Sequence, residues 1–182
     1  MSVFTNAPGS TAEETAEYVK AVLGLVGDRD PLGILRDTPE AVRGAIANIP
    51  PGQLLQPEMA GKWSIAQVVR HLADSEIVWA WRLRLILAQD RPELTGYDQD
   101  RWAGRLGYER ADAGESLELF STVRRSNVRL LERATAADLK RVGVHSERGE
   151  ESLEHLRRLY AGHDLLHLRQ IERVRRAVAQ AV

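Results

Sequence analysis

The chain has 182 residues, a formal net charge of −1 at pH 7 and no cysteine. This length predicts a single domain over residues 1–182, large enough to bury its own core. Without cysteine there can be no disulfide, thiolate ligand or cysteine nucleophile, so any metal must be held by nitrogen or oxygen. The near-neutral charge provides no general field that would attract nucleic acid or an anionic membrane.

The ends of the chain support a cytoplasmic protein without nucleic-acid or membrane partners. The N-terminal stretch MSVFTNAPGSTAEET lacks the basic region and apolar run of a signal peptide. No later stretch approaches the roughly 18 uncharged residues that a membrane-spanning helix needs. Arginines cluster near the C-terminus, but cations there complement a helix macrodipole, and no aromatic residues are interleaved with them.

The first half of the chain begins with helical signals. Thr11 with Glu14 forms a capping box, which predicts a first amphipathic helix from Ser10 or Thr11 to about residue 27. A short helix is expected to follow Thr38, with Pro39 at its first position. Loop is expected from the next prolines to residue 62.

Three long helices are expected in the remainder. Ser64 with Gln67 forms a second capping box, which predicts a helix to about Gln89. A crossover loop with a turn of helix around Trp102 should lead to the next, over residues 112–133, and Thr135 should cap a brief helix. The last helix is expected after the break at residue 149. No segment alternates with period two, so we predict an all-α four-helix bundle with a long crossover connection, short accessory helices and essentially no sheet.

The last helix carries the most informative polar residues. His163 and His167 are four residues apart, which places both imidazoles on one helical face about a turn apart. Both occupy the apolar stripe, where an unpaired polar ring costs free energy and one metal ion would satisfy both. Catalytic metal sites use three protein ligands and keep one position open, and His71 is the best third candidate. A hydrogen-bonded core histidine remains the alternative for His71.

Two other histidines are weaker candidates. His145 is expected in a loop beside Gly143, and His155 lies two turns from His163. We therefore leave both out of the predicted metal site.

The sequence resembles the DinB-like superfamily over roughly Pro57 to the C-terminus. An H-x-x-x-H-x-x-Q-I pattern on the last helix, paired with H-x-x-D-x-E on an earlier one, carries the resemblance. The matching segments are Gly61–Ile65, His71–Glu76, Gly96–Asp100 and Gly162–Ile171. The resemblance implies a bundle whose core covers about residues 10–181, with the metal motifs within residues 61–171. It also implies that His71, His163 and His167 bind one divalent ion, nickel or zinc.

The resemblance implies several activities. Similar proteins include YfiT-type proteins described as metal-dependent hydrolases, and relatives that transfer the thiols bacillithiol, mycothiol or glutathione. A cation stabilises bound thiolate or hydroxide, so either nucleophile is available at neutral pH. We expect transfer of a low-molecular-weight thiol cosubstrate to a small electrophilic substrate. The alternatives are a hydrolase using metal-bound water, and a non-catalytic metal-binding bundle with a role in stress. A homodimer is compatible with each.

Two further residues are candidates for roles at the site. Asp74, one turn after His71, could orient an imidazole or move a proton, or could be a solvated helix charge. Gln170, one turn after His167, could hydrogen-bond a ligand or substrate, or could tie two helices together. We predict Asp74 as the catalytic residue and Gln170 as the residue that contacts the bound group.

Overall fold

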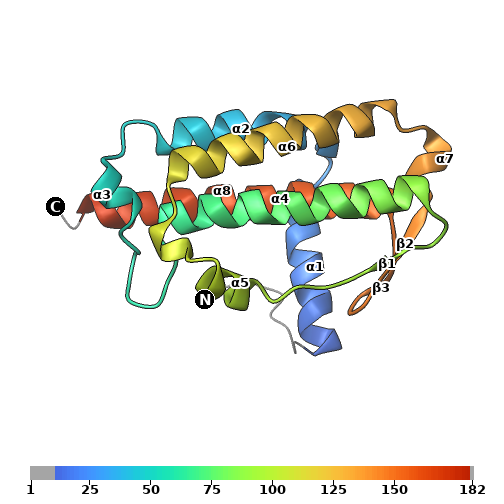
Figure 1. Ribbon diagram of the computed structural model, residues 1–182, viewed down its shortest axis with the longest axis horizontal. Coiled ribbons are helices and arrows are strands. Elements are labelled where there is room, and N and C mark those ends of the chain that lie inside the picture. The colour runs from blue at the N-terminus through green and yellow to red at the C-terminus, as the bar shows by residue number, and fades with distance from the viewer. Residues whose placement is uncertain (1–10, 181–182) are drawn as a thin grey trace.

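Four long helices form the body of the protein. The computed structural model describes residues 11–180, and in Figure 1 these helices lie side by side along the longest axis. They are α2 (Pro31–Ile46), α4 (Ile65–Ala88), α6 (Ala113–Arg133) and α8 (Leu153–Gln180). α4 packs between α6 and α8, and α2 closes the bundle against the same two helices.

The direction of the helices requires a crossover. α2 and α8 run one way along the bundle, whereas α4 and α6 run the other (Figure 1). α3 (Pro51–Leu54) lies in the connection from α2 to α4, where loop was expected. The chain returns from the end of α4 through β1 (Glu93–Leu94), α5 (Gln99–Arg105) and a 3₁₀ turn, η1 (Tyr108–Arg110). The predicted all-α four-helix bundle with a long crossover is therefore confirmed.

α1 (Ala12–Val26) crosses the bundle and packs on α8. Thr11 caps it, and the capping box with Glu14 is present; Ser10, the other expected start, lies outside the described residues. The two helices approach closely at Gly162, where a β-carbon would lie 2.2 Å from the carbonyl oxygen of Val22. Only glycine permits this crossing without a shift of the backbone.

The prediction that a short helix begins at Pro39 was wrong. α2 begins at Pro31, where Asp30 accepts hydrogen bonds from two backbone N–H groups of the first turn. Pro39 lies inside the helix and has no N–H to donate to the carbonyl oxygen of Leu35. The Arg124 guanidinium of α6 donates to that oxygen instead, at 2.9 Å. A contact from another helix therefore satisfies the carbonyl that the proline leaves free.

The structure also contains a small three-stranded sheet that the sequence did not predict. β2 (Val142–His145) pairs in parallel with β1 and antiparallel with β3 (Gly149–Ser152), after the short helix α7 (Ala136–Leu139). Strands of two to four residues are too short to show an alternating pattern. Gly143 permits the packing of this sheet, because a β-carbon there would lie 2.6 Å from Leu94 Cδ1.

A polar layer divides the apolar core into two clusters. On α4, the residues up to Ala73 belong to one cluster and those from Trp79 onward to the other. On α8 the order is reversed, with Ala161 in the second cluster and Ile171 in the first. Buried polar side chains occupy the interval between the clusters on both helices. None of the helices within residues 11–180 is long and apolar enough to cross a membrane.

Candidate metal centre

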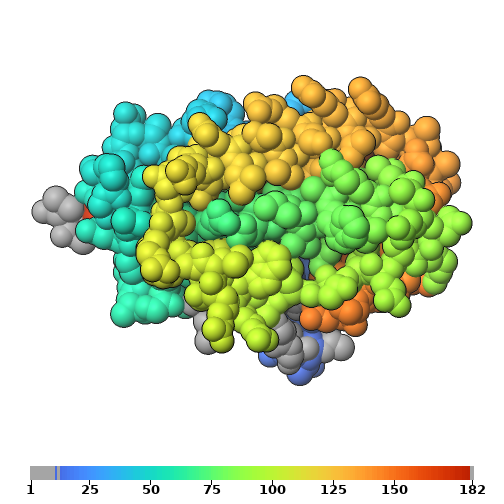
Figure 2. Space-filling view, viewed as in Figure 1, coloured from blue at the N-terminus to red at the C-terminus, as the bar shows by residue number. Residues whose placement is uncertain are grey.

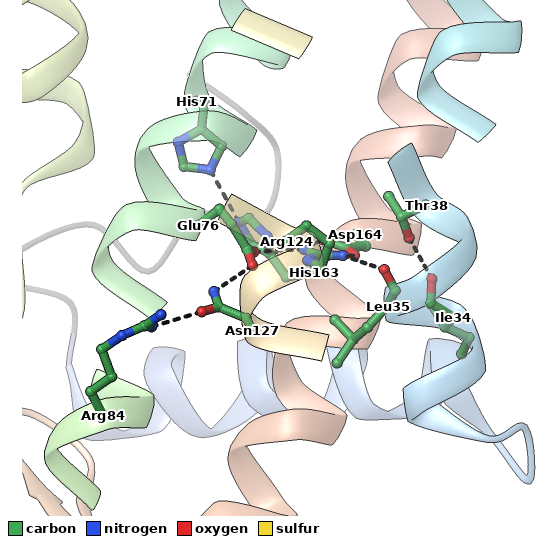
Figure 3. Close-up of polar contacts among 10 residues, drawn as sticks. All are labelled: Ile34, Leu35, Thr38, His71, Glu76, Arg84, Arg124, Asn127, His163 and Asp164. Carbon is green, nitrogen blue, oxygen red and sulfur yellow. Dashed lines mark hydrogen bonds and ion pairs between the residues drawn. The ribbon is translucent and has the colours of Figure 1, made fainter. Parts of the chain in front are cut away.

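Three histidines converge in the polar layer. His71 comes from α4, and His163 and His167 come from α8. The Nε2 atom of His163 lies 3.1 Å from Nε2 of His71 and 3.1 Å from Nε2 of His167. Figure 3 shows the imidazole of His71 directed at His163. The structure thus brings together the three residues that the sequence nominated as ligands.

The three imidazoles are in the neutral state that can bind a cation. Burial, the largest cause, lowers the pKa of all three imidazoles, that of His167 to about 4, so they are neutral at pH 7. The Nδ1 atom of His167 lies 2.8 Å from Gln170 Oε1, an acceptor, so Nδ1 donates and Nε2 keeps its lone pair. His163 Nε2 carries at most one proton and cannot donate to both neighbours. A divalent ion that prefers imidazole nitrogen, such as zinc or nickel, fits this donor set.

Gln170 contacts the triad directly. It is buried on α8, and its side-chain oxygen fixes the tautomer and orientation of His167. The predicted role in contacting a bound group remains a prediction, since the contact described is with a residue of the triad.

We expect Gln170→Leu to weaken zinc binding about 10- to 100-fold, because His167 loses the acceptor that orients its ring. Competition with a chelating dye measures the affinity. Gln170→Glu is the matched control: its carboxylate also accepts from Nδ1, so affinity should be retained. Equal losses in the two variants would contradict an orienting role and indicate a general packing defect.

Asp74 has different partners from those expected. Its carboxylate accepts a hydrogen bond from the Tyr108 hydroxyl at 2.7 Å and forms an ion pair with Arg70 at 3.1 Å. Neither contact involves a histidine of the triad, and Asp74 does not line the cavity that adjoins the triad. It is buried, unlike the solvated charge that was the alternative. The catalytic role of Asp74 remains a prediction that these contacts do not support.

A cavity of about 90 Å³ adjoins the triad. His71 and His163 form part of its wall, together with Ser75 and Arg82 of α4 and Tyr97 of the crossover. The Trp63 ring, which does not line the cavity, packs against His71 at a centroid distance of 5.1 Å. The triad therefore packs against an aromatic ring and also borders a cavity whose wall is both polar and apolar.

The crossover provides part of the wall of this cavity. In Figure 2 the yellow-green segment lies over the bundle beside the green surface of α4, where the chain returns toward α6. Asp98 caps α5 by accepting from the N–H of Arg101. Tyr97 and Trp102 pack with ring centroids 4.6 Å apart. The predicted helical turn around Trp102 is confirmed by α5.

Comparison with known proteins agrees with this geometry. The family profile of the DinB superfamily matches residues 34–171. The chain belongs to the DinB superfamily. The matched region begins within α2, earlier in the chain than the resemblance to Pro57 and beyond indicated.

Relatives of this DinB-superfamily chain carry names that refer to metal. A protein of Bacillus licheniformis, provisionally named a metal-dependent hydrolase, is 32% identical over 78% of this chain and 81% of its own length. A protein of Geobacillus thermodenitrificans with the same provisional name is 31% identical over 91% of this chain and 86% of its own length. The structure of YfiT from Bacillus subtilis, described as a probable metal-dependent hydrolase with an unusual four-helix bundle topology, matches with a TM-score of 0.75. The two chains are 28% identical, and the match covers 80% of this chain and 84% of the YfiT chain.

A buried ion network supports the triad in this DinB fold. Arg124 of α6 forms ion pairs with Glu76 of α4 and Asp164 of α8 and donates to the α2 carbonyl of Leu35. Asn127 donates to the second oxygen of Glu76 at 2.7 Å (Figure 3). Asp164 directly follows His163 in the chain, so the network joins all four bundle helices beside the triad.

The sequence reasoning missed three residues of this region. Arg124 lies on the buried face of α6, and an arginine within an apolar stripe was the available signal. Arg82 likewise lies on the buried face of α4, among apolar residues. His145 was placed in a loop, but it lies in β2, is buried and lines the cavity. The short strand gave no signal for that position.

Proposed function

We propose that this chain is a metal-dependent enzyme in which His71, His163 and His167 hold one divalent ion, nickel or zinc. The convergence of the three Nε2 atoms beside a cavity carries the proposal. Within the described residues, no fourth imidazole or carboxylate joins this group. Three protein ligands are typical of catalytic sites, whereas structural sites usually have four.

The reaction that we propose is transfer of a low-molecular-weight thiol to a small electrophilic substrate. Bound at such a site, a divalent ion lowers the pKa of a thiol or a water in its open position and so supplies a nucleophile at neutral pH. The chain has no cysteine, so the thiol would come from a cosubstrate. His71 and His163 belong to the triad and also line the cavity. The electrophile would lie in this cavity, beside the triad.

Hydrolysis is the second candidate. The provisional names of the relatives favour it, since each refers to a metal-dependent hydrolase. The same three ligands would serve, with water in place of the thiol. The two reactions therefore differ in what enters the open position and not in the ligand set.

Cobalt substitution separates these functions. We expect the metal content of the purified chain, measured by mass spectrometry, to approach one ion per chain, and the cobalt form to gain a charge-transfer band when a small thiol is added. A band that never appears, with turnover of model esters or amides, would favour hydrolysis. Metal without any exchangeable ligand would favour the non-catalytic bundle, and absence of metal binding would overturn the proposal.

A further inference from the structure

The cavity beside the triad contains a buried cation without a carboxylate partner. Arg82 is 5% exposed and lines the cavity wall. Its guanidinium donates to the Tyr160 hydroxyl at 3.2 Å and to the Thr95 carbonyl at 2.6 Å, and also lies against His145. All three partners are neutral at pH 7, and its Nε is buried without a partner among the described residues. A buried charge of this kind calls for an anion nearby.

His145 faces two donors at once. The backbone N–H of Glu147 donates to Nδ1 at 3.1 Å, and Arg82 Nη2 lies 3.2 Å from Nε2. A neutral imidazole has one acceptor nitrogen and one donor nitrogen. The Glu147 N–H belongs to the turn between β2 and β3, so it fixes Nδ1 as the acceptor and places the proton on Nε2. The N–H groups of Arg82 and His145 are therefore brought together with no acceptor between them.

The cavity wall contains two other charged residues, Arg148 and Glu147. Arg148 forms two hydrogen bonds with Glu151, at 2.7 and 2.8 Å, so its charge is balanced. Glu147 is exposed and lies against Gly96. Burial, with the charges of Arg148 and Arg82, lowers the pKa of His145 to about 3, which keeps the ring neutral and limited to one acceptor nitrogen.

We propose that Arg82 and His145 bind an anionic oxygen of the substrate, as the carboxylate of a small organic acid or the phosphate of a small ester, in the cavity beside the triad. An oxygen between the two N–H donors would accept from both and provide the counter-ion that Arg82 lacks. The cavity of about 90 Å³ is small beside ligand pockets of about 300–1,000 Å³, so it suits one such group and not a large molecule. The inference rests on the proposed function for the reaction, since the reactive end of the acid would face the triad.

Anion binding by the full-length chain tests this inference independently of catalysis. Succinate and inorganic phosphate are titrated by calorimetry into the metal-free and the zinc-loaded protein. We expect one of the two anions to bind both forms, about tenfold or more weaker in Arg82→Gln and in His145→Phe. The anion that binds more tightly identifies the source of the oxygen. Arg125→Gln, at an exposed position on α6, is the matched control and should bind as the wild type does.

Nitrogen NMR of the His145 ring supplies a second readout. We expect the proton on Nε2, and its signal should shift when the bound anion is added. His145→Phe keeps an aromatic ring at this position without the N–H, so it also serves if Arg82→Gln fails to fold.

The outcomes separate this site from the metal site. If the chain binds an anion through Arg82 but binds no zinc, the anion site is supported and the proposed function fails. Binding of the anion only to the zinc form, unchanged by Arg82→Gln, would overturn the inference and leave the metal site intact. A His145 proton on Nδ1, or no binding of either anion, would also overturn it.

Discussion

Replacing His163 with alanine should abolish stoichiometric zinc binding, with an affinity loss of about 100-fold or more. His163 Nε2 lies within 3.1 Å of both other ligand nitrogens, so its removal leaves only His71 and His167, one from each helix. Loss of an orienting contact alone already costs about 10- to 100-fold, and loss of a ligand should cost more. Metal content by mass spectrometry and affinity by dye competition measure the effect.

His155→Ala is the matched control for this substitution. His155 lies on the same helix, partly buried, and faces Glu151 instead of the triad. Zinc should raise the midpoint of thermal unfolding of the wild type and of His155→Ala, because a ligand that binds only the folded state stabilises it. The midpoint of His163→Ala should not respond to zinc, while its helical circular dichroism stays intact. An undiminished zinc stoichiometry in His163→Ala would contradict the site assignment.

Arg124→Met should lower the free energy of unfolding by about 3–5 kcal/mol. The substitution leaves Glu76 and Asp164, both about 1% exposed, as buried carboxylates without their cation. It also leaves the Leu35 carbonyl without the donor that replaces the missing N–H of Pro39. Urea unfolding followed by circular dichroism measures the loss. Zinc affinity should fall as well, since the network holds α4 and α8 together beside the ligands.

Arg125→Met is the control for the loss of an arginine from α6. Arg125 is exposed, so this change should alter the free energy of unfolding by less than about 0.5 kcal/mol. Adding Glu76→Gln and Asp164→Asn to Arg124→Met should restore part of the lost stability, because the unpaired charges are removed with their partner. Equal stabilities of Arg124→Met and Arg125→Met would show that the network does not hold the bundle together.

Much of the bundle and of the candidate site was predictable because the signals are local. The capping boxes at Thr11 and Ser64 mark the starts of α1 and α4 as observed. The spacing of His163, His167 and Gln170 within one helix already places them on one face, whatever the rest of the chain does. His71 was a weaker inference, because nothing local indicates which face of α4 meets α8.

The sequence by itself determined α1, α4, α6 and α8, the caps of α1 and α4 and the shared face of the residues on α8, since each depends on neighbours a few positions apart. Only the tertiary structure decided the rest. Local rules place Pro39 at the start of a helix, but it lies inside α2, because Arg124, 85 positions later, donates to the carbonyl that the proline leaves free. Arg82 meets His145 through a strand too short to be predicted. Contacts between distant segments depend on how the helices pack, and no local pattern encodes them.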